Sequence, residues 1–187
     1  KGLTYLVDVI AALKTRGHRV VAHIIGAKDE HSSGSLEYAA EFERLIDELG
    51  VSGQVILHGM MRQEEMAPLI QKSRAFVAPY VETASGDKDG IPTAMLEALA
   101  SALPVITTDA GSIIEVIDDD VEGLIVEQGN AEAFGNALEK LIVSPEMQRR
   151  MAKAARARFD RDFDIQVTEK RLHERVSALV QPKVRAQ

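Results

Sequence analysis

Two carboxylates, Asp89 and Glu97, lie eight residues apart and bracket the start of an apolar, helix-prone stretch. Pro92 suits the first position of a helix because no amide hydrogen is lost there, and Gly90 lets the backbone approach a ligand closely. The free amides from Ile91 to Ala94 would then point outward with partial positive charge. The sequence therefore predicts a phosphate-type anion site at this helix end, with a carboxylate on either side.

Glu97 belongs to a polar stripe on this helix, together with Thr93 and Ser101 at spacings of four residues. In the ordinary interpretation, Glu97 faces solvent or pairs with a neighbouring group, and Asp89 is a plain surface charge. In the functional interpretation, Glu97 accepts hydrogens from the hydroxyls of a sugar, and such charge-assisted bonds contribute roughly 1.5–3 kcal/mol each. Two acids at this spacing are a weak signal alone, so the sequence leaves both interpretations open.

Short β-branched segments alternate with amphipathic helices along the chain. Strands are predicted at 19–25, 55–57, 75–78, 104–107 and 123–126, and helices at about 3–13, 38–49, 66–70, 92–102, 131–142, 145–158 and 164–180. Short buried strands separated by helices favour parallel pairing, because parallel strands need crossover connections. We therefore expect an α/β fold with a doubly wound parallel sheet, and ligands at the carboxyl ends of its strands.

The domain is expected to occupy residues 1–180, with 181–187 as a frayed tail. The first helix begins at residue 2, and a doubly wound domain normally opens with a strand that feeds such a helix. We expect this strand, and a whole preceding domain, upstream of Lys1. Pro68 must fall in the first turn of the third helix or kink it.

The composition narrows the class of protein. The chain has 187 residues, 22 Lys plus Arg against 29 Asp plus Glu, a net charge of −7 and no Cys. The missing cysteines exclude a disulfide scaffold, a thiolate zinc site and a cysteine nucleophile. The acidic balance argues against a nucleic-acid partner. No apolar run approaches the ~18–20 residues of a membrane helix, and no phosphate-loop or dinucleotide motif is present.

The five histidines form no close pair at the sequence spacing of metal ligands. His23 lies in a predicted strand and is expected to be a packed or paired core residue. His58 lies at a predicted strand end, where a ligand contact is the alternative to a structural role. No metal site is therefore expected from the histidines.

The stretch from Asp87 to Thr108, DKDGIPTAMLEALASALPVITT, closely resembles the signature of the group 1 retaining glycosyltransferases of the GT-B fold. That signature is an acid, seven residues and a Glu, with a Gly and a helix inside and a Pro-Val turn after it. Further similar segments are Lys1 to Leu3, Val55 to Gly59, Ala110 to Ile117 and Glu122 to Val126. The resemblance covers about residues 1–180 and implies the Rossmann-like C-terminal half of such an enzyme.

The resemblance also implies roles for particular residues. Asp89 would contact the donor sugar, and Glu97 would bind the ribose hydroxyls of a nucleotide-diphosphate sugar. Lys1 would neutralise the diphosphate. The resemblance further implies that transfer retains the anomeric configuration and needs no metal or other cofactor. The remaining donor contacts would come from the backbone of Gly90, Ile91, Pro92 and Thr93, and from Met61 and Arg62 near the base.

The acceptor, a saccharide or a lipid-linked one, would bind to an N-terminal domain that this chain lacks. We expect the isolated chain to bind donor weakly and to transfer nothing. A cytoplasmic protein with peripheral association at the inner membrane face would fit the family. The first acid is Asp89 where the family usually has Glu, so its sugar contacts have less reach. The alternatives are a sugar-nucleotide sensor on the same fold, and an unrelated flavodoxin-like protein in which Glu97 is a surface acid.

Overall fold

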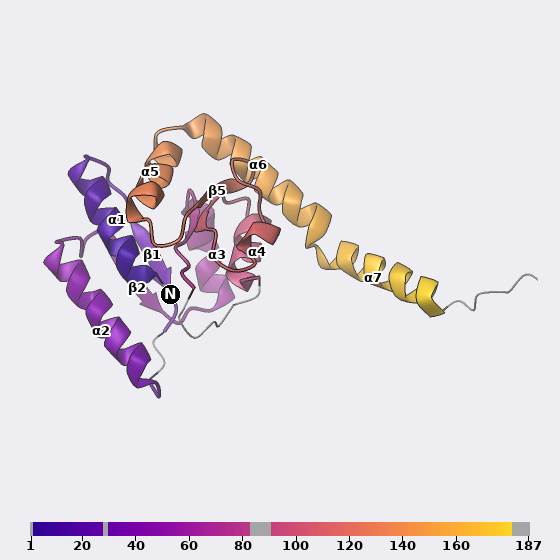
Figure 1. Ribbon diagram of the computed structural model, residues 1–187, viewed down its shortest axis with the longest axis horizontal. Helices are drawn as coiled ribbons and strands as arrows, with labels where there is room; N and C mark the ends of the chain where they lie inside the picture. The colour runs from indigo at the N-terminus through magenta and orange to yellow at the C-terminus, as the bar shows by residue number, and fades with distance from the viewer. Residues whose placement is uncertain (1, 28–29, 83–90, 181–187) are drawn as a thin grey trace, which may run out of the picture.

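The computed structural model describes residues 2–27, 30–82 and 91–180 and has an α/β architecture (Figure 1). The strands are β1 (Ala22–Ile25), β2 (Val55–Gly59), β3 (Phe76–Ala78), β4 (Val105–Thr108) and β5 (Gly123–Val126). The helices are α1 (Leu3–Thr15), α2 (Ser33–Glu48), α3 (Gln63–Lys72), α4 (Thr93–Ala100), α5 (Ala131–Ile142), α6 (Pro145–Asp162) and α7 (Ile165–Val180), with a short 3₁₀ turn at Ile113–Glu115.

Every strand pair in the described residues is parallel, as the alternating pattern predicts. β1 pairs with β2, and β3, β4 and β5 form a second sheet in that order. The sheet is thus divided into two parts rather than continuous. The strands of each part are parallel, because each connection within a part passes through a helix or a long loop. The carboxyl ends of the strands therefore continue into the loops that precede the helices.

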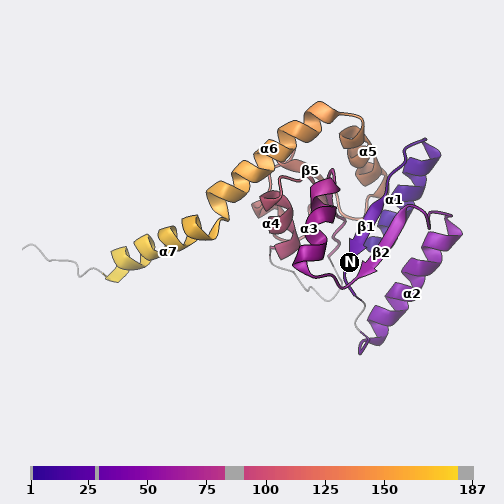
Figure 2. The same cartoon turned by 180° about the vertical axis from the view of Figure 1, so that it is seen from behind.

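One hydrophobic cluster joins the two sheets. Ala22 and Ile24 of β1, Val77 of β3 and Ile106 of β4 all pack in the same cluster as the apolar face of α1. α1 itself contacts α2 on one side and α5 on the other (Figures 1 and 2). A second cluster lies beneath α4 and α6, around the fully buried Leu99. Both sheets therefore share one hydrophobic cluster beneath a layer of helices, and α4 packs on a separate apolar cluster.

Some element boundaries, and the position of one proline, differ from the sequence prediction. β1 begins at Ala22 rather than at residue 19, since the three preceding residues join no ladder. α6 continues to Asp162, four residues beyond the predicted end. Pro68 lies inside α3 and past its first turn, so the predicted first-turn placement is wrong. α3 tolerates the lost amide because none of its residues is buried.

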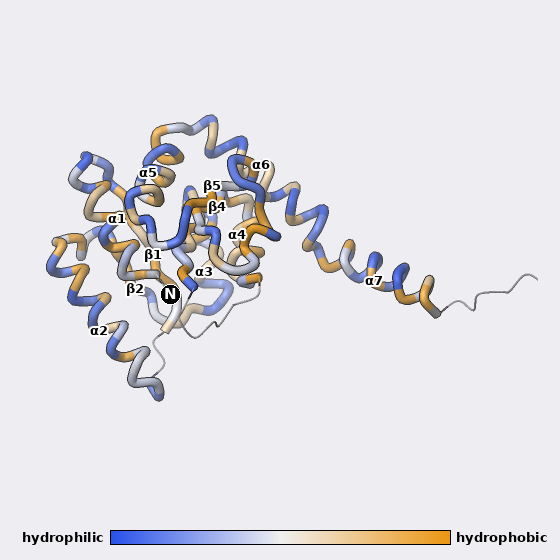
Figure 3. The backbone as a smooth tube through the Cα atoms, in the orientation of Figure 1, coloured by the Kyte–Doolittle hydropathy of each residue, from blue (hydrophilic) through white to orange (hydrophobic). Residues whose placement is uncertain are grey.

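α7 projects away from the body of the domain in both views (Figures 1 and 2). Polar and apolar residues alternate along it (Figure 3). Four of its large apolar side chains are exposed, namely Ile165, Leu172, Val176 and Leu179. α7 packs against α6 at its beginning. The described helix therefore leaves an apolar stripe in contact with solvent.

Candidate functional site

The start of α4 carries the predicted anion site. The first helical residue is Thr93, and Pro92 is the N-cap with φ −66° and ψ 124°, so the prediction of Pro92 at the first helical position is wrong by one residue. The fixed φ of proline still suits this place, because an N-cap residue is extended. The Met95 amide donates to the Pro92 carbonyl at 3.0 Å, and no side chain of the described residues caps the helix.

Other helices in the described part of the chain have a side-chain oxygen on their first-turn amides. The Tyr38 hydroxyl accepts from the amides of Leu3 and Thr4 at the start of α1, at 2.7 and 3.2 Å. The corresponding acceptors are Ser32 for α2, Asn130 for α5 and Ser144 for α6. α3 and α4 lack such an acceptor among the described residues, so the start of α4 keeps the partial positive charge that α1, α2, α5 and α6 share with their caps.

Glu97 is exposed on α4, and its carboxylate makes no hydrogen bond or ion pair with any residue that the structure describes, whereas its backbone carbonyl accepts from the Ser101 amide within the helix end. Thr93 and Ser101 are exposed as well, whereas Met95 and Leu99 are fully buried on the opposite side. The predicted polar stripe is confirmed. Because Glu97 has no partner inside the described protein, its carboxylate is available to a ligand.

Two buried threonines of β4 fix the backbone that leads to α4. The Thr107 hydroxyl donates to the Ala78 carbonyl at 3.0 Å, and the Thr108 hydroxyl donates to the Tyr80 carbonyl at 2.7 Å. Both threonines have 0% exposure. These bonds hold the residues after β3 against the end of β4, although the sequence analysis assigned neither threonine a role.

Gly2, at the start of α1, touches the same segment. Its φ is 79°, and a Cβ at this position would lie 1.7 Å from the Pro79 carbonyl oxygen. Only glycine combines this conformation with so close an approach. The structure therefore brings the residue after Lys1 next to the beginning of the loop that contains Asp89.

Hydrogen bonds also join the loops that follow β3, β4 and β5. The Glu82 amide donates to Gln128 at 2.8 Å, and the Gly111 amide donates to the Glu82 carboxylate at 3.3 Å. The Asp109 carboxylate accepts from the Gln128 amide at 2.9 Å. These polar contacts lie at the carboxyl edge of the sheet, and the sequence analysis missed them because they join residues far apart in the chain.

Met61 and Arg62 lie between β2 and α3. Met61 is half-buried and the Arg62 side chain is exposed, while the Arg62 amide donates to the Glu65 carboxylate at 2.8 Å. Both residues follow the carboxyl end of β2, as predicted. Of the other predicted residues, Ile91, Pro92 and Thr93 lie at the start of α4, and Lys1, Asp89 and Gly90 lie outside the described residues.

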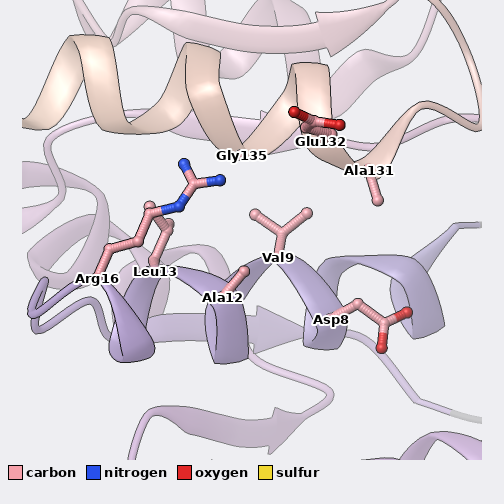
Figure 4. Close-up of a pocket in the computed structure, with 8 residues that line it drawn as sticks. All are labelled: Asp8, Val9, Ala12, Leu13, Arg16, Ala131, Glu132 and Gly135. Carbon is pink, nitrogen blue, oxygen red and sulfur yellow. The ribbon is translucent and has the colours of Figure 1, made fainter.

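The hollow between α1 and α5 is separate from the start of α4. Its volume is about 250 Å³, and Val9 of α1 points toward Gly135 of α5 within it (Figure 4). Asp8, Arg16 and Glu132 lie at its rim. None of the predicted donor-binding residues that the structure describes lines it. The helix-to-helix hollow is therefore not the predicted site.

The described residues lack two features. They contain no group of three or more His, Asp or Glu side chains placed to hold a metal ion. None of their helices combines the length and the apolar character needed to cross a bilayer. The structure does bring two histidines together: His23 of β1 and His58 of β2 lie 2.8 Å apart, nitrogen to nitrogen. His23 is exposed, so the expectation of a core residue is wrong, although it is paired.

The sequence matches the family described as Glycosyl transferases group 1 over residues 1–158. The chain belongs to this family. It is 30% identical over 174 residues to the amylovoran biosynthesis glycosyltransferase AmsK of Erwinia amylovora, which covers 93% of the chain and 41% of AmsK. It is 26% identical to the putative colanic acid biosynthesis glycosyltransferase WcaL of Escherichia coli, over 96% of the chain and 42% of WcaL. This group 1 glycosyltransferase chain thus spans about two fifths of the length of these relatives.

Solved structures agree with the fold. The chain superposes on Anabaena Alr3699/HepE, solved in complex with UDP and glucose, with a TM-score of 0.80 and 21% identity, covering 95% of this chain and 45% of that one. Such likeness confirms the predicted fold, the Rossmann-like C-terminal half of the GT-B glycosyltransferases. The family and fold that the resemblance implies are therefore confirmed.

Proposed function

We propose that this chain is the donor-binding part of a longer glycosyltransferase that transfers a sugar from a nucleotide-diphosphate sugar to an acceptor. One observation carries the proposal: the start of α4 is uncapped, and one turn along the same helix Glu97 is exposed and has no partner among the described residues. A diphosphate and a sugar hydroxyl are the complementary ligands, since amides attract the anion and a carboxylate accepts hydroxyl hydrogens.

Each predicted residue then has one task. The backbone of Gly90, Ile91, Pro92 and Thr93 would face the sugar and the diphosphate. Pro92 has no amide hydrogen, so it contributes only its conformation. Glu97 would bind the two ribose hydroxyls, and Met61 and Arg62 would flank the base. Asp89 would contact the donor sugar and Lys1 the diphosphate, two roles that rest on the family resemblance alone.

The transfer would retain the anomeric configuration and would proceed without a resident metal ion. Negative charge develops on the diphosphate as its bond to the sugar breaks. The helix start supplies fixed positive charge for it, and Lys1 would add to that charge. No cofactor is needed for this chemistry. Transfer activity that survives a chelator such as EDTA is the corresponding expectation.

The missing part of the sheet belongs between β1 and β3. α1 lies between α2, which connects β1 to β2, and α5, which follows β5. A strand that feeds α1 would therefore enter between the two sheets, and the right-handed crossover rule places it parallel to its neighbours. An N-terminal acceptor domain would precede this strand, and the exposed stripe of α7 offers it an apolar contact surface.

The acceptor is proposed to be a saccharide or a lipid-linked saccharide. AmsK and WcaL are described as glycosyltransferases of amylovoran and colanic acid biosynthesis, and both products are polysaccharides by name. A cytoplasmic enzyme that acts at the inner membrane face would meet such acceptors. The donor nucleotide is open, and the UDP bound by Anabaena Alr3699/HepE makes UDP-sugars the first to test.

A thermal-shift panel of UDP-, GDP- and ADP-sugars tests the donor site. Ligand at 100 times Kd should stabilise the protein by about 2.7 kcal/mol, and only one nucleotide class should do so. Glu97→Ala should weaken binding of that nucleotide sugar by about 10- to 150-fold, the equivalent of at least one charge-assisted bond. The unliganded melting temperature should not change, because Glu97 contacts no described residue.

Glu37→Ala is the matched control, because Glu37 is an exposed glutamate on α2 without a partner in the described residues. It should bind the donor as the wild type does. The panel should be repeated with the full-length protein, in which the proposed strand and domain are present. Absence of any shift there, or equal binding by Glu97→Ala and the wild type, would refute the proposed donor site.

A further inference from the structure

Two imidazoles from neighbouring strands meet on one face of the β1–β2 sheet. The His23 Nδ1 and the His58 Nε2 are 2.8 Å apart, and the residues are 35 positions apart in the chain. The β1–β2 register pairs His23 with Ile56, so His58 follows two residues later and faces the same side. This pair is not among the residues proposed to bind the donor.

The two rings meet edge to edge. Their planes differ by 21°, and their centroids are 5.1 Å apart. That separation exceeds the nitrogen–nitrogen distance by about the two ring radii, so the nitrogens lie near the line that joins the ring centres. In this arrangement each nitrogen directs its lone pair or its hydrogen at the other, and one hydrogen is shared between them.

An irregularity in the ladder orients His58. Ile24 pairs with Leu57, but Ile25 pairs with Gly59, so His58 is an extra residue without a partner in β1. Gly59 has φ 67°, which allows the strand to bend there. Bulges are rare in parallel pairs, and they typically re-aim a side chain. The backbone itself therefore turns His58 toward His23.

We infer that His23 and His58 together chelate a divalent transition-metal ion of the copper or nickel class. Two nitrogens bound to one ion at right angles, with bonds of about 2.0 Å, lie about 2.8 Å apart, whereas a tetrahedral ion needs about 3.3 Å. The observed 2.8 Å therefore matches neighbouring corners of a square-planar site. The ring that donates the shared hydrogen changes to its other tautomer, with that hydrogen on the nitrogen remote from the pair. Both facing nitrogens then have a free lone pair, and each ring turns so that its lone pair points at the ion.

Water fills the other corners of this site. No third His, Asp or Glu accompanies the pair among the described residues, and the flanking side chains on the same face are Ile25 and Ile56, both exposed. Two imidazoles favour Cu²⁺ over the other first-row ions, following the general order of affinities. The bound ion would clamp β1 to β2, at a distance along the sheet from α4.

Titration of the whole chain with Cu²⁺ tests the inference. Calorimetry should give one ion per chain, and electron paramagnetic resonance should give a tetragonal signal with two nitrogen ligands. His23→Gln and His58→Gln should each lower the affinity at least tenfold, and Zn²⁺ should bind the wild type at least tenfold more weakly than Cu²⁺. His173→Gln is the control, since His173 is an exposed histidine on α7, and it should bind Cu²⁺ as the wild type does.

A measurement on the unmodified protein guards against variants that fail to fold. Substoichiometric Cu²⁺ should broaden the imidazole resonances of His23 and His58 first, because paramagnetic broadening acts at short range. Equal broadening at His31 or His173 would overturn the inference. So would an unchanged Cu²⁺ affinity in a folded His58→Gln variant.

Discussion

Glu139 of α5 shows how one residue ties two helices together. Its carboxylate accepts from Arg16 at 2.6 Å and contacts His18 at 2.7 Å, both of which lie at the end of α1 or just after it. The hydrogen bond from Arg16, followed by that from His18, lowers the pKa of Glu139 below its ordinary value. The ionised form is therefore favoured in the folded state.

This lowered pKa predicts a dependence of stability on pH. A carboxyl group whose pKa is lower in the folded protein stabilises it fully above the unfolded value of about 4.3, and the contribution disappears as the pH falls through the folded value. Urea unfolding midpoints should fall more steeply below about pH 4.5 for the wild type than for Glu139→Gln.

Glu132→Gln is the control for this comparison, because Glu132 is an exposed acid on the same helix. Its midpoints should follow those of the wild type over the whole pH range. Parallel curves for Glu139→Gln and the wild type would show that the contact between α1 and α5 contributes nothing.

The sequence predicts single residues well where one local pattern decides their environment. Glu97, Thr93 and Ser101 are exposed because the helical period sets them opposite Met95 and Leu99. The sequence does not predict the contact between His23 and His58, because strand register and a bulge decide it. Nor does it predict the hydrogen bonds of Thr107 and Thr108, which depend on the neighbour that β4 acquires in the sheet.

At the scale of elements, the closest approach in the sheet is between β4 and β5. A Cβ on Gly123 would lie 1.9 Å from the Val105 carbonyl oxygen and 2.7 Å from its carbonyl carbon. The obstacle is backbone rather than a flexible side chain, so a larger residue must push β4 and β5 apart. Gly123 therefore fixes the spacing of the strands that support α4.

Gly123→Ala should lower the free energy of unfolding by about 2–5 kcal/mol, the range of disruptive overpacking in a core. Gly34→Ala is the counterpart, because nothing lies within 4 Å of a Cβ at this helical position in α2. It should be neutral or raise the free energy by up to about 1 kcal/mol. Chemical denaturation measures both, and equal stability of Gly123→Ala and the wild type would contradict the packing described.

Element types follow from the sequence better than element ends do. The period of the apolar residues identifies the helices and strands named above, including the whole of α5. The ends depend on partners: β1 begins where β2 begins to pair with it, and α6 continues to Asp162, where three arginines surround the carboxylate. Such partners come from distant parts of the chain, so a local pattern cannot reveal them.

At the scale of the whole molecule, the sequence predicts the parallel α/β fold but not the division into two sheets. The division follows from the way α1 bridges both parts, together with the strand proposed to feed α1. In this chain the facing sides of β1 and β3 have no hydrogen-bonded strand among the described residues. The amides on those sides therefore have no strand partner among the described residues.

Hydrogen exchange tests this arrangement. In the full-length protein, the amides of β1 and β3 that do not donate within either sheet should exchange at least tenfold more slowly than in this chain, because a strand between the sheets would accept their hydrogens. The ladder amides between β4 and β5 serve as the internal reference and should change much less. Equal rates in both proteins would argue against a strand at this place.

The same two strand sides have a practical consequence for work on the isolated chain. An unpaired strand side is a template for a second polypeptide, and neither β1 nor β3 carries a lysine or proline there to repel one. Self-association that grows with concentration, and aggregation during expression or storage, follow from this feature. Adding the strand proposed to lie between β1 and β3 is a more direct remedy than changing residues on the surface.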